Sequence, residues 1–338
     1  SSLNNCVFTA NTAPYGGGIN TNHSSSLTLT NCVFTNNSAS SDGGGIYTSS
    51  SYSSSLISLT LTNCVFTNNT AGYDGGGISS DRYSSLTLNN SILWKNSSYN
   101  IEGHGLNTDY ISFKSILLQE AIEAQYPGDP NARDAVYEPD LNILQGWEGD
   151  ARAFDADPLF VDIDNPAGPD GTWFTEDDGL RVTSGSPAID AGYNDSLPPD
   201  TSDIDGDGNL TEVIPYDALH RSRVIGSRVD IGPYEFDPDN PPPVVKTLLT
   251  LSTTNGGAVT GGGYYDKGAS ATLEASPLSG YLFSNWSGDA NGSSNPLSIT
   301  MDLDKSITAN FIQDSNDDDG DGLTNFAEFV TYGTDPSK

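Results

Sequence analysis

Asn31-Cys32-Val33-Phe34-Thr35 is one copy of a five-residue motif that recurs along the first hundred positions of the chain and indicates their fold. Copies begin at Asn5, Asn31 and Asn63, and a weaker copy, Asn90-Ser91-Ile92-Leu93-Trp94, begins at position 90. Successive copies are therefore 26, 32 and 27 residues apart. Similarity at a nearly constant spacing of this size is typical of a solenoid, in which each repeat forms one turn and packs on its neighbours.

Within each repeat, apolar residues alternate with polar ones. Leu27-Thr28-Leu29 has a period of two and is flanked by turn-forming residues, a pattern that predicts short strands and excludes a helical solenoid. The chain is expected to turn at Thr30-Asn31, so that equivalent side chains stack about 4.8 Å apart, the strand spacing. The predicted inward-facing side chains of one coil are Leu27, Leu29, Cys32, Phe34 and Ile46. Cys6, Cys32 and Cys64 would then form a column of buried free thiols.

Two further motifs carry a resemblance to a known group of proteins. Phe34-x-x-Asn37 recurs as Phe66-x-x-Asn69, and a Gly-Gly-x-Ile motif recurs in the same repeats. These motifs resemble the repeats of chlamydial polymorphic outer-membrane proteins and related right-handed parallel β-helices. The resemblance implies that fold and a surface-displayed adhesin or passenger domain. We therefore expect a protein that is secreted or held on the bacterial cell surface.

The charge of the chain restricts its partners. The 45 acidic residues outnumber the 13 basic ones and give a net charge of −32. A surface this negative repels the phosphates of nucleic acids and anionic lipid headgroups, and no apolar run approaches the roughly 18 residues of a membrane span. We expect no nucleic acid partner and no membrane insertion. Self-repulsion also favours bound cations, and Ca²⁺ is the first candidate.

Charge and composition divide the chain into segments. Residues 1–100 contain three acids and two bases, residues 101–245 contain 30 and seven, and residues 246–338 contain 12 and four. The expected segments are the β-helix repeats (1–100), an acidic continuation and end region of the β-helix (101–236), a proline-rich linker (237–246), a small β module (247–312) and a calcium-binding tail (313–338). The expected fold class is all-β: a right-handed parallel β-helix followed by a small β module and a short calcium-loop tail.

Three motifs occur in a fixed order in the acidic segment. DPLFVD (157–162) precedes SPAIDAG (186–192), and DIGPYE (230–235) follows. This order resembles the choice-of-anchor Q region found at the end of secreted bacterial β-helical proteins, which implies a location but no reaction. We expect this segment to add short strands, including residues 141–144, and to cover the open end of the β-helix. Residues 117–122 favour a short helix on an inserted loop.

The small β module is predicted from alternation and from a second resemblance. Apolar residues occupy every second position of residues 269–275, as in a half-buried strand. Gly280-Tyr281-x-Phe283-x-x-Trp286 and the closing Thr308-Ala309-Asn310-Phe311 resemble the divergent internalin-type B-repeat, a small β domain of bacterial surface proteins. Trp286 has two interpretations, an anchor of the core or a platform on which sugars stack.

The tail contains a complete calcium-loop pattern. Asp317-x-Asp319-x-Asp321-Gly322-x5-Glu328 places oxygen ligands at positions 1, 3, 5 and 12 and a glycine at the turn. The carbonyl of Leu323 would complete the shell, and Asn325 would assist directly or through water. With Gly333-Thr334-Asp335-Pro336, the segment resembles thrombospondin type 3 or dockerin-like calcium repeats. The alternative is an acidic, solvated tail.

A second acidic loop has only half of this pattern. Asp203-x-Asp205-x-Asp207-Gly208 matches the first positions of a calcium loop, but position 12 is Ile214. Glu212 is the candidate that would replace the missing terminal carboxylate. The sequence leaves two interpretations open, a second calcium site or an ordinary solvated Asp-Gly turn.

Candidate catalytic residues are confined to a weak pair. Asp42 and Asp74 precede the glycine runs of successive coils, at an expected separation near that of the two carboxylates of a retaining glycosidase. The favoured interpretation, however, is that these aspartates accept backbone N–H groups at glycine turns. The sequence favours a structural or adhesive protein that binds glycans or other proteins on its Ser/Thr/Asn-rich faces and is stabilised by calcium. An open first coil would also allow end-to-end stacking with a second chain. The alternative is a carbohydrate-active enzyme, a polysaccharide lyase or glycoside hydrolase built on a β-helix.

Overall fold

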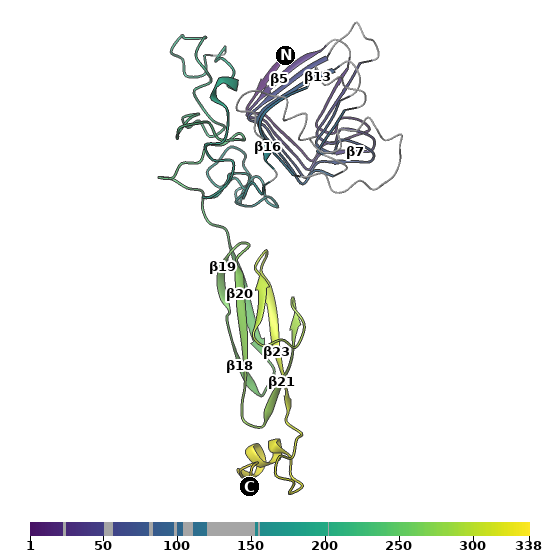
Figure 1. Ribbon diagram of the computed structural model, residues 1–338, viewed down its shortest axis with the longest axis vertical. Helices are drawn as coiled ribbons and strands as arrows, with labels where there is room; N and C mark the ends of the chain where they lie inside the picture. The colour runs from purple at the N-terminus through teal and green to yellow at the C-terminus, as the bar shows by residue number, and fades with distance from the viewer. Residues whose placement is uncertain are drawn as a thin grey trace. The chain divides into compact units, whose positions relative to one another are not determined.

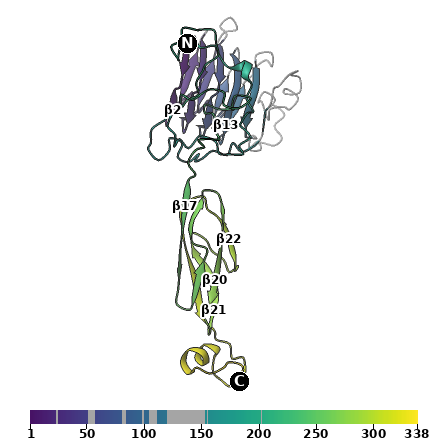
Figure 2. The same cartoon turned by 90° about the vertical axis from the view of Figure 1, so that its left-hand side faces the viewer.

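The computed structural model describes two compact units, Ser1–Pro243 and Val244–Lys338 (Figures 1 and 2). The described residues are 1–22, 25–50, 57–80, 84–97, 100–103, 111–119, 153–154, 156–201 and 203–338. The boundary between the units lies within the expected linker, residues 237–246. No helix among the described residues has the length and apolar character needed to cross a bilayer.

Parallel strands build the first part of unit 1. The largest sheet contains β1 (Ser2–Asn4), β2 (Val7–Thr9), β5 (Ser26–Thr30), β6 (Val33–Thr35), β9 (Ile57–Thr62), β10 (Val65–Thr67), β13 (Ser84–Trp94), β15 (Ile111–Leu118) and β16 (Ala153–Phe154). A second sheet contains β3 (Thr12–Ala13), β7 (Ser38–Ala39) and β11 (Thr70–Ala71), and a third contains β4 (Ile19–Asn22), β8 (Ile46–Ser49), β12 (Ile78–Ser80) and β14 (Ile101–Gly103). The first three coils therefore pair with one another in all three sheets, and the coil of β13 and β14 continues the pairing in the first and third, as in a parallel β-helix; Figure 2 shows the strands lying side by side.

The register of the coils follows the sequence repeat. Val33 is paired with Val7 on one side and with Val65 on the other, and Val65 is paired with Ile92. The predicted corner is confirmed, because Asn31 has a φ of 51° and its three equivalents have values of 45° to 54°. Asparagine is one of the few residues that enter this left-handed region at low cost, which explains why it begins every repeat.

The interior of the coils consists of stacked identical side chains. The rings of Phe8, Phe34 and Phe66 stack with centroid separations of 4.6 and 4.5 Å and are nearly parallel. The three cysteines occupy equivalent positions of successive coils as predicted and all three thiols are free, but only Cys32 and Cys64 are buried, and Cys6 in the first coil is partly exposed. The thiols of Cys32 and Cys64 each donate to the carbonyl two residues earlier, at Thr30 and Thr62. Aromatic and thiol columns of this kind bury large apolar areas only because the coils are in register.

A ladder of asparagines crosses the coils on the inside of a second corner. Oδ1 of Asn69 accepts from the backbone N–H of Asn37 at 3.1 Å and from its Nδ2 at 2.9 Å. Nδ2 of Asn69 donates to the carbonyl of Phe34 and to Oδ1 of Asn96. Asn11 bonds to Asn37 in the same way. The Phe-x-x-Asn motif thus supplies one rung per coil, and each amide satisfies buried polar groups of its neighbour.

Close backbone contact explains the glycine runs. A Cβ atom on Gly44 would lie 2.4 Å from the carbonyl oxygen of Gly76 in the next coil, and Gly43 has a φ of 70°. Only glycine meets both requirements at this corner.

The acidic segment lies against the side of the β-helix. Between residues 156 and 245 the described residues form one short 3₁₀ helix, η2 (Asn194–Ser196), and isolated bridges instead of the expected coils. Its apolar side chains, including Leu180, Val182 and Ile231, pack on Val33 and Val65. The expectation of further coils covering the open end is therefore wrong for these residues, because the outward valines form an apolar column that this segment covers.

Two other expectations concern residues around the insertion. Leu117 and Leu118 end strand β15 and do not begin a helix. Glu120, Ala121 and Ile122 of the expected helix, and the expected strand at 141–144, lie outside the described residues.

Unit 2 contains a small β module of two sheets. The first has the order β19 (Gly263–Asp266), β17 (Lys246–Thr253), β23 (Lys305–Gln313), β21 (Tyr281–Gly288), and the second has the order β18 (Gly257–Thr260), β20 (Ser270–Pro277), β22 (Leu297–Thr300). Ala271, Leu273 and Ala275 are buried, which confirms the predicted alternation. Trp286 is fully buried and its Nε1 donates to the carbonyl of Ser294 at 2.8 Å. Trp286 is thus an anchor of the core and not a platform for sugars.

Removing one rung of the asparagine ladder should destabilise unit 1. Asn69→Ala leaves the backbone N–H of Asn37 and the carbonyl of Phe34 without their partner, so we expect the free energy of unfolding to fall by about 2–4 kcal/mol. Urea titrations monitored by hydrogen exchange of the amides of β6 and β10 measure the free energy of unfolding of unit 1 separately from that of unit 2. Asn20→Ala, at an exposed position, is the control and should change stability by less than about 0.5 kcal/mol. An Asn69→Ala protein as stable as the parent would contradict the ladder.

Candidate metal sites

The predicted calcium loop of the tail brings its aspartates together. One carboxylate oxygen from each of Asp317, Asp319 and Asp321 lies within 4.8 Å of the others. The two oxygens of Asp317 accept from the backbone N–H groups of Gly320 and Gly322 at 2.8 and 3.0 Å. Both glycines have a positive φ, which folds the loop around the three side chains. The spacing read from the sequence therefore produces a convergent oxygen cluster.

Glu328 lies at the start of a short π-helical segment, η3 (Ala327–Tyr332), and its carboxylate is not among the oxygens that lie within 4.8 Å of one another, although the charges of Asp319 and Asp321 act on it. Its side chain is 1% exposed, and no described residue donates a hydrogen bond to its Oε2 or to Oδ2 of Asp319. Burial, followed by the charges of Asp319 and Asp321, raises the pKa of Glu328. Buried carboxylate oxygens that repel one another and lack donors are unfavourable without a cation, so this donor set fits a hard divalent ion such as Ca²⁺.

Asn325 makes two hydrogen bonds across the loop, and its predicted part in holding an ion stays a prediction. Its Oδ1 accepts from the backbone N–H of Asp318 at 3.2 Å, and its Nδ2 donates to Asp314 at 2.9 Å. Asn325 thus braces the two ends of the loop. Leu323 donates its N–H to Asp321 at 2.8 Å, and its carbonyl stays a predicted ligand.

The loop is anchored on the β module of the same unit. The N–H of Asp314 donates to the carbonyl of Gly280 at 2.9 Å, and the rings of Phe326 and Tyr281 meet edge to face at 5.2 Å. A Cβ atom on Gly280 would lie 3.2 Å from Cα of Phe326. An ion that orders the loop would therefore also fix the residues that pack on the module.

The second acidic loop also forms a cluster, and it includes a residue that sequence analysis missed. Asp203, Asp205 and Asp207 converge, and Asp205 additionally converges with Glu212 and Asp200. Asp200 lies before the recognised pattern, so no motif pointed to it. The signal that finds it is three-dimensional, namely its burial beside other acids.

The weak catalytic candidates lie in successive coils, as expected, and the carboxylate of Asp42 accepts hydrogen bonds at its turn. Oδ1 of Asp42 accepts from the backbone N–H of Asp74 at 3.3 Å, and Oδ2 accepts from Ser41 at 3.0 Å. The N–H of Gly43 in turn donates to the backbone carbonyl of Asp74. This geometry fits the interpretation of aspartates that accept hydrogen bonds at a glycine turn.

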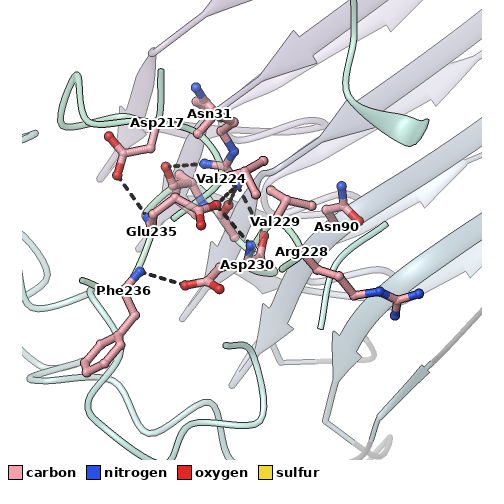
Figure 3. Close-up of polar contacts among 12 residues, drawn as sticks. Asn31, Asn90, Asp217, Val224, Arg228, Val229, Asp230, Glu235 and Phe236 are labelled. Carbon is pink, nitrogen blue, oxygen red and sulfur yellow. Dashed lines mark hydrogen bonds and ion pairs between the residues drawn. The ribbon is translucent and has the colours of Figure 1, made fainter. Parts of the chain in front are cut away.

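A buried ionic cluster in the acidic segment is a further candidate (Figure 3). Arg223 is 1% exposed, and its guanidinium donates to the backbone carbonyls of Asp230, Gly232 and Pro233. Its Nη2 lies 3.3 Å from Oε1 of Glu235, which accepts from the N–H of Asp230. Asp217 and Asp230 accept from the N–H groups of Glu235 and Phe236. One cation therefore faces three buried acids.

The pKa values in this cluster follow from burial. Desolvation, opposed by Arg223, raises the pKa of Glu235 to about 8, and desolvation raises that of Asp230 to about 6. Shifted carboxyl groups are typical of active sites, but these groups are at most 3% exposed and are bonded to the backbone. Nearby, the N–H of Gly232 donates to the carbonyl of Asn90 at 2.8 Å, which joins the segment to the β-helix. The cluster is therefore structural.

The cluster predicts a dependence of stability on pH. The folded-state pKa of Glu235 lies above its value of 4.5 in the unfolded chain, so its contribution is complete below that value and is lost as the pH rises through about 8. Between pH 6 and 9 the parent should lose on the order of 2–4 kcal/mol more than Glu235→Gln. Urea unfolding at saturating calcium, followed by hydrogen exchange across residues 229–236, provides the measurement. Asp239→Asn, at an exposed position, should keep the parental slope, and equal slopes for parent and Glu235→Gln would refute the assignment.

Two family models match parts of the chain. One, described as a right handed beta helix region, matches residues 1–113. The other, described as a divergent InlB B-repeat domain, matches residues 247–315. No curated protein and no solved structure matches the chain. With the observed sheets, these matches show an all-β chain in which a right-handed parallel β-helix precedes a separate B-repeat module, and this pair of domains suggests an extracellular structural or surface protein.

Proposed function

We propose that this chain is a secreted or bacterial cell-surface protein that binds glycans or other proteins on its β-helix and is stabilised by Ca²⁺. The finer resemblances of the sequence, to chlamydial surface repeats, a choice-of-anchor Q region and thrombospondin type 3 repeats, agree with this proposal and stay predictions. The proposal depends most on one observation, an ordered array of hydroxyl side chains on the outside of the coils.

Rows of hydroxyl groups run across the outward face of β1, β5, β9 and β13. Thr28 is paired with Ser2 and with Thr60, which is paired with Thr87. A second row contains Ser26, Ser58 and Ser85. Among the threonines, Thr28, Thr60 and Thr87 are partly exposed. Hydroxyl groups repeated at the strand spacing of about 4.8 Å offer paired donors and acceptors to the hydroxyls of an extended glycan.

A pocket lies at one end of these rows. Its walls are Ser2, Asn4, Thr28 and Thr30 from the coils and Pro198, Pro199, Asp200, Thr201 and Ile214 from the acidic segment. Concave sites with a few convergent polar groups are the usual places for small ligands. The pocket therefore supplies an end point at which one sugar of a bound chain would be held more tightly than on the open face.

The calcium part of the proposal connects the tail to an extracellular setting. Calcium loops of extracellular modules bind in the range of about 10⁻⁴ to 10⁻³ M, so millimolar calcium fills them. The buried Glu328 and the convergent aspartates of the tail are the observations that support such a site.

Calcium titration tests the tail site. Metal-stripped protein should bind Ca²⁺ in a calorimeter, and Asp319→Asn/Glu328→Gln should bind one ion fewer, because it removes two charges from the shell while keeping the side-chain shapes. The matched control, Asp289→Asn/Glu274→Gln, changes the same residue types in the β module outside the cluster and should retain the parental stoichiometry. Equal stoichiometry in the tail variant and the parent would contradict the site.

Binding to a polysaccharide panel tests the hydroxyl array. We expect retention without new reducing ends, and Thr28→Val/Thr60→Val should weaken it at least about tenfold, since each substitution removes a hydroxyl and keeps the shape. Thr272→Val/Thr300→Val, on the β module, is the matched control. Turnover of a polysaccharide would replace the proposal with the alternative of a carbohydrate-active enzyme, and unchanged affinity of Thr28→Val/Thr60→Val would reject the array as the binding face.

A further inference from the structure

The loop that begins at Asp203 lacks its expected last ligand. Position 12 of the pattern is Ile214, which is 4% exposed and packs with Leu197 and Val229 in a small apolar cluster. Its side chain anchors the loop and cannot coordinate an ion. A site at this loop therefore needs carboxylates from elsewhere.

Asp200 meets this requirement. It is 1% exposed, and its Oδ2 accepts from the N–H of Ile204 at 2.7 Å. Oδ1 of Asp200 has no donor among the described residues. One carboxylate oxygen from each of Asp200, Asp205 and Glu212 lies within 4.8 Å of the others. A buried carboxylate that is aimed at two other acids, with an unused oxygen, is costly unless a cation neutralises it.

Glu212 also offers an oxygen without a donor. The residue is partly buried, and its Oε2 accepts from Nδ2 of Asn209 at 3.3 Å, whereas its Oε1 is buried without a donor among the described residues. Residues 195–220 contain no lysine or arginine, so no basic side chain of this stretch balances the cluster.

The backbone holds these two acids together before any ion binds. The N–H of Asp200 donates to the carbonyl of Glu212 at 2.7 Å, and the adjacent Pro199 and Val213 form an antiparallel bridge. The loop is therefore closed at its base, with one acid on each side of the closure. Ligands fixed in this way lose little conformational entropy on binding.

We propose that Asp200 and Glu212, together with Asp203, Asp205 and Asp207, form a second calcium site in unit 1. All ligands are carboxylates, and their number and spacing suit the larger, more flexible shell of Ca²⁺ better than the strict octahedron of Mg²⁺. The site is independent of the tail loop, which lies in the other unit. It also goes beyond the proposed glycan binding, although Asp200 and Ile214 line the same pocket, so the ion would fix one wall of it.

The test uses full-length chain in which the tail site has been removed by Asp319→Asn/Glu328→Gln. Calorimetric titration of this metal-stripped protein with CaCl₂ should show one remaining ion. Adding Asp200→Asn should weaken that binding at least about tenfold, because a charged ligand is lost, whereas the matched control Asp195→Asn, in η2, should leave it unchanged. Glu212→Gln should weaken it similarly. Circular dichroism of each variant in calcium-free buffer checks that the fold is retained.

Three results would overturn the site. They are the absence of calcium binding in the protein without the tail site, equal affinity of the Asp200→Asn and Asp195→Asn proteins, and equal affinity for MgCl₂ and CaCl₂. If the Asp200→Asn protein does not fold, the calcium affinity of the Glu212→Gln protein is compared with that of the Asp195→Asn protein instead. The calcium titration measures ion binding and the polysaccharide panel measures glycan binding, so the two tests are independent. A negative calcium titration rejects only the second calcium site, and a negative polysaccharide assay rejects only the proposed glycan binding.

Discussion

The structure of unit 1 depends on the in-register stacking of identical residues between neighbouring coils. Each coil is too short to bury its own apolar side chains or to pair its own backbone groups, and both needs are met only by the coil above and the coil below. Asn37 and Asn69 show this dependence, because the side-chain amide of each one hydrogen-bonds to backbone groups of the preceding coil. A shift of register by one residue would break the amide ladder and turn the phenylalanine column outward.

The same constraint explains the acidic segment. Val33 and Phe34 are neighbours on one strand and point to opposite faces, yet both are fully buried. Phe34 is covered by the coil interior, and Val33 needs a second layer, which Leu180 and Val182 supply. That layer has little regular structure, so its backbone is held by side chains instead, notably the buried Arg223 and the acids around it. The acidic residues of this segment therefore fall into two groups. One group surrounds the buried Arg223, and the other lies in loops where several carboxylates are close together.

Several features could be predicted from the sequence because they are periodic or local. The coil, its corner at Asn31 and the cysteine column follow from repetition, and the aspartate cluster of the tail follows from spacing alone. The position of the acidic segment on the side of the β-helix could not be predicted in the same way, because a segment that covers the open end and a segment that covers the side need the same apolar residues. The distinguishing signal is that Val33 is apolar although its neighbour Phe34 faces the interior. Val33 must then face outward, so an apolar layer is needed on that side of the coils. Asp200 and the bracing role of Asn325 could not be predicted, because both depend on how distant parts of a loop meet.

A sulfur anomalous difference map from crystals of the chain shows whether equivalent residues of successive coils are stacked. In stacked coils, the Sγ atoms of Cys6, Cys32 and Cys64 appear as three peaks in a row, separated by about 4.8 Å, the spacing of paired strands. Three peaks that do not form a row at this spacing would contradict the stacked coils, and with them the hydroxyl rows and the side layer that the coils support.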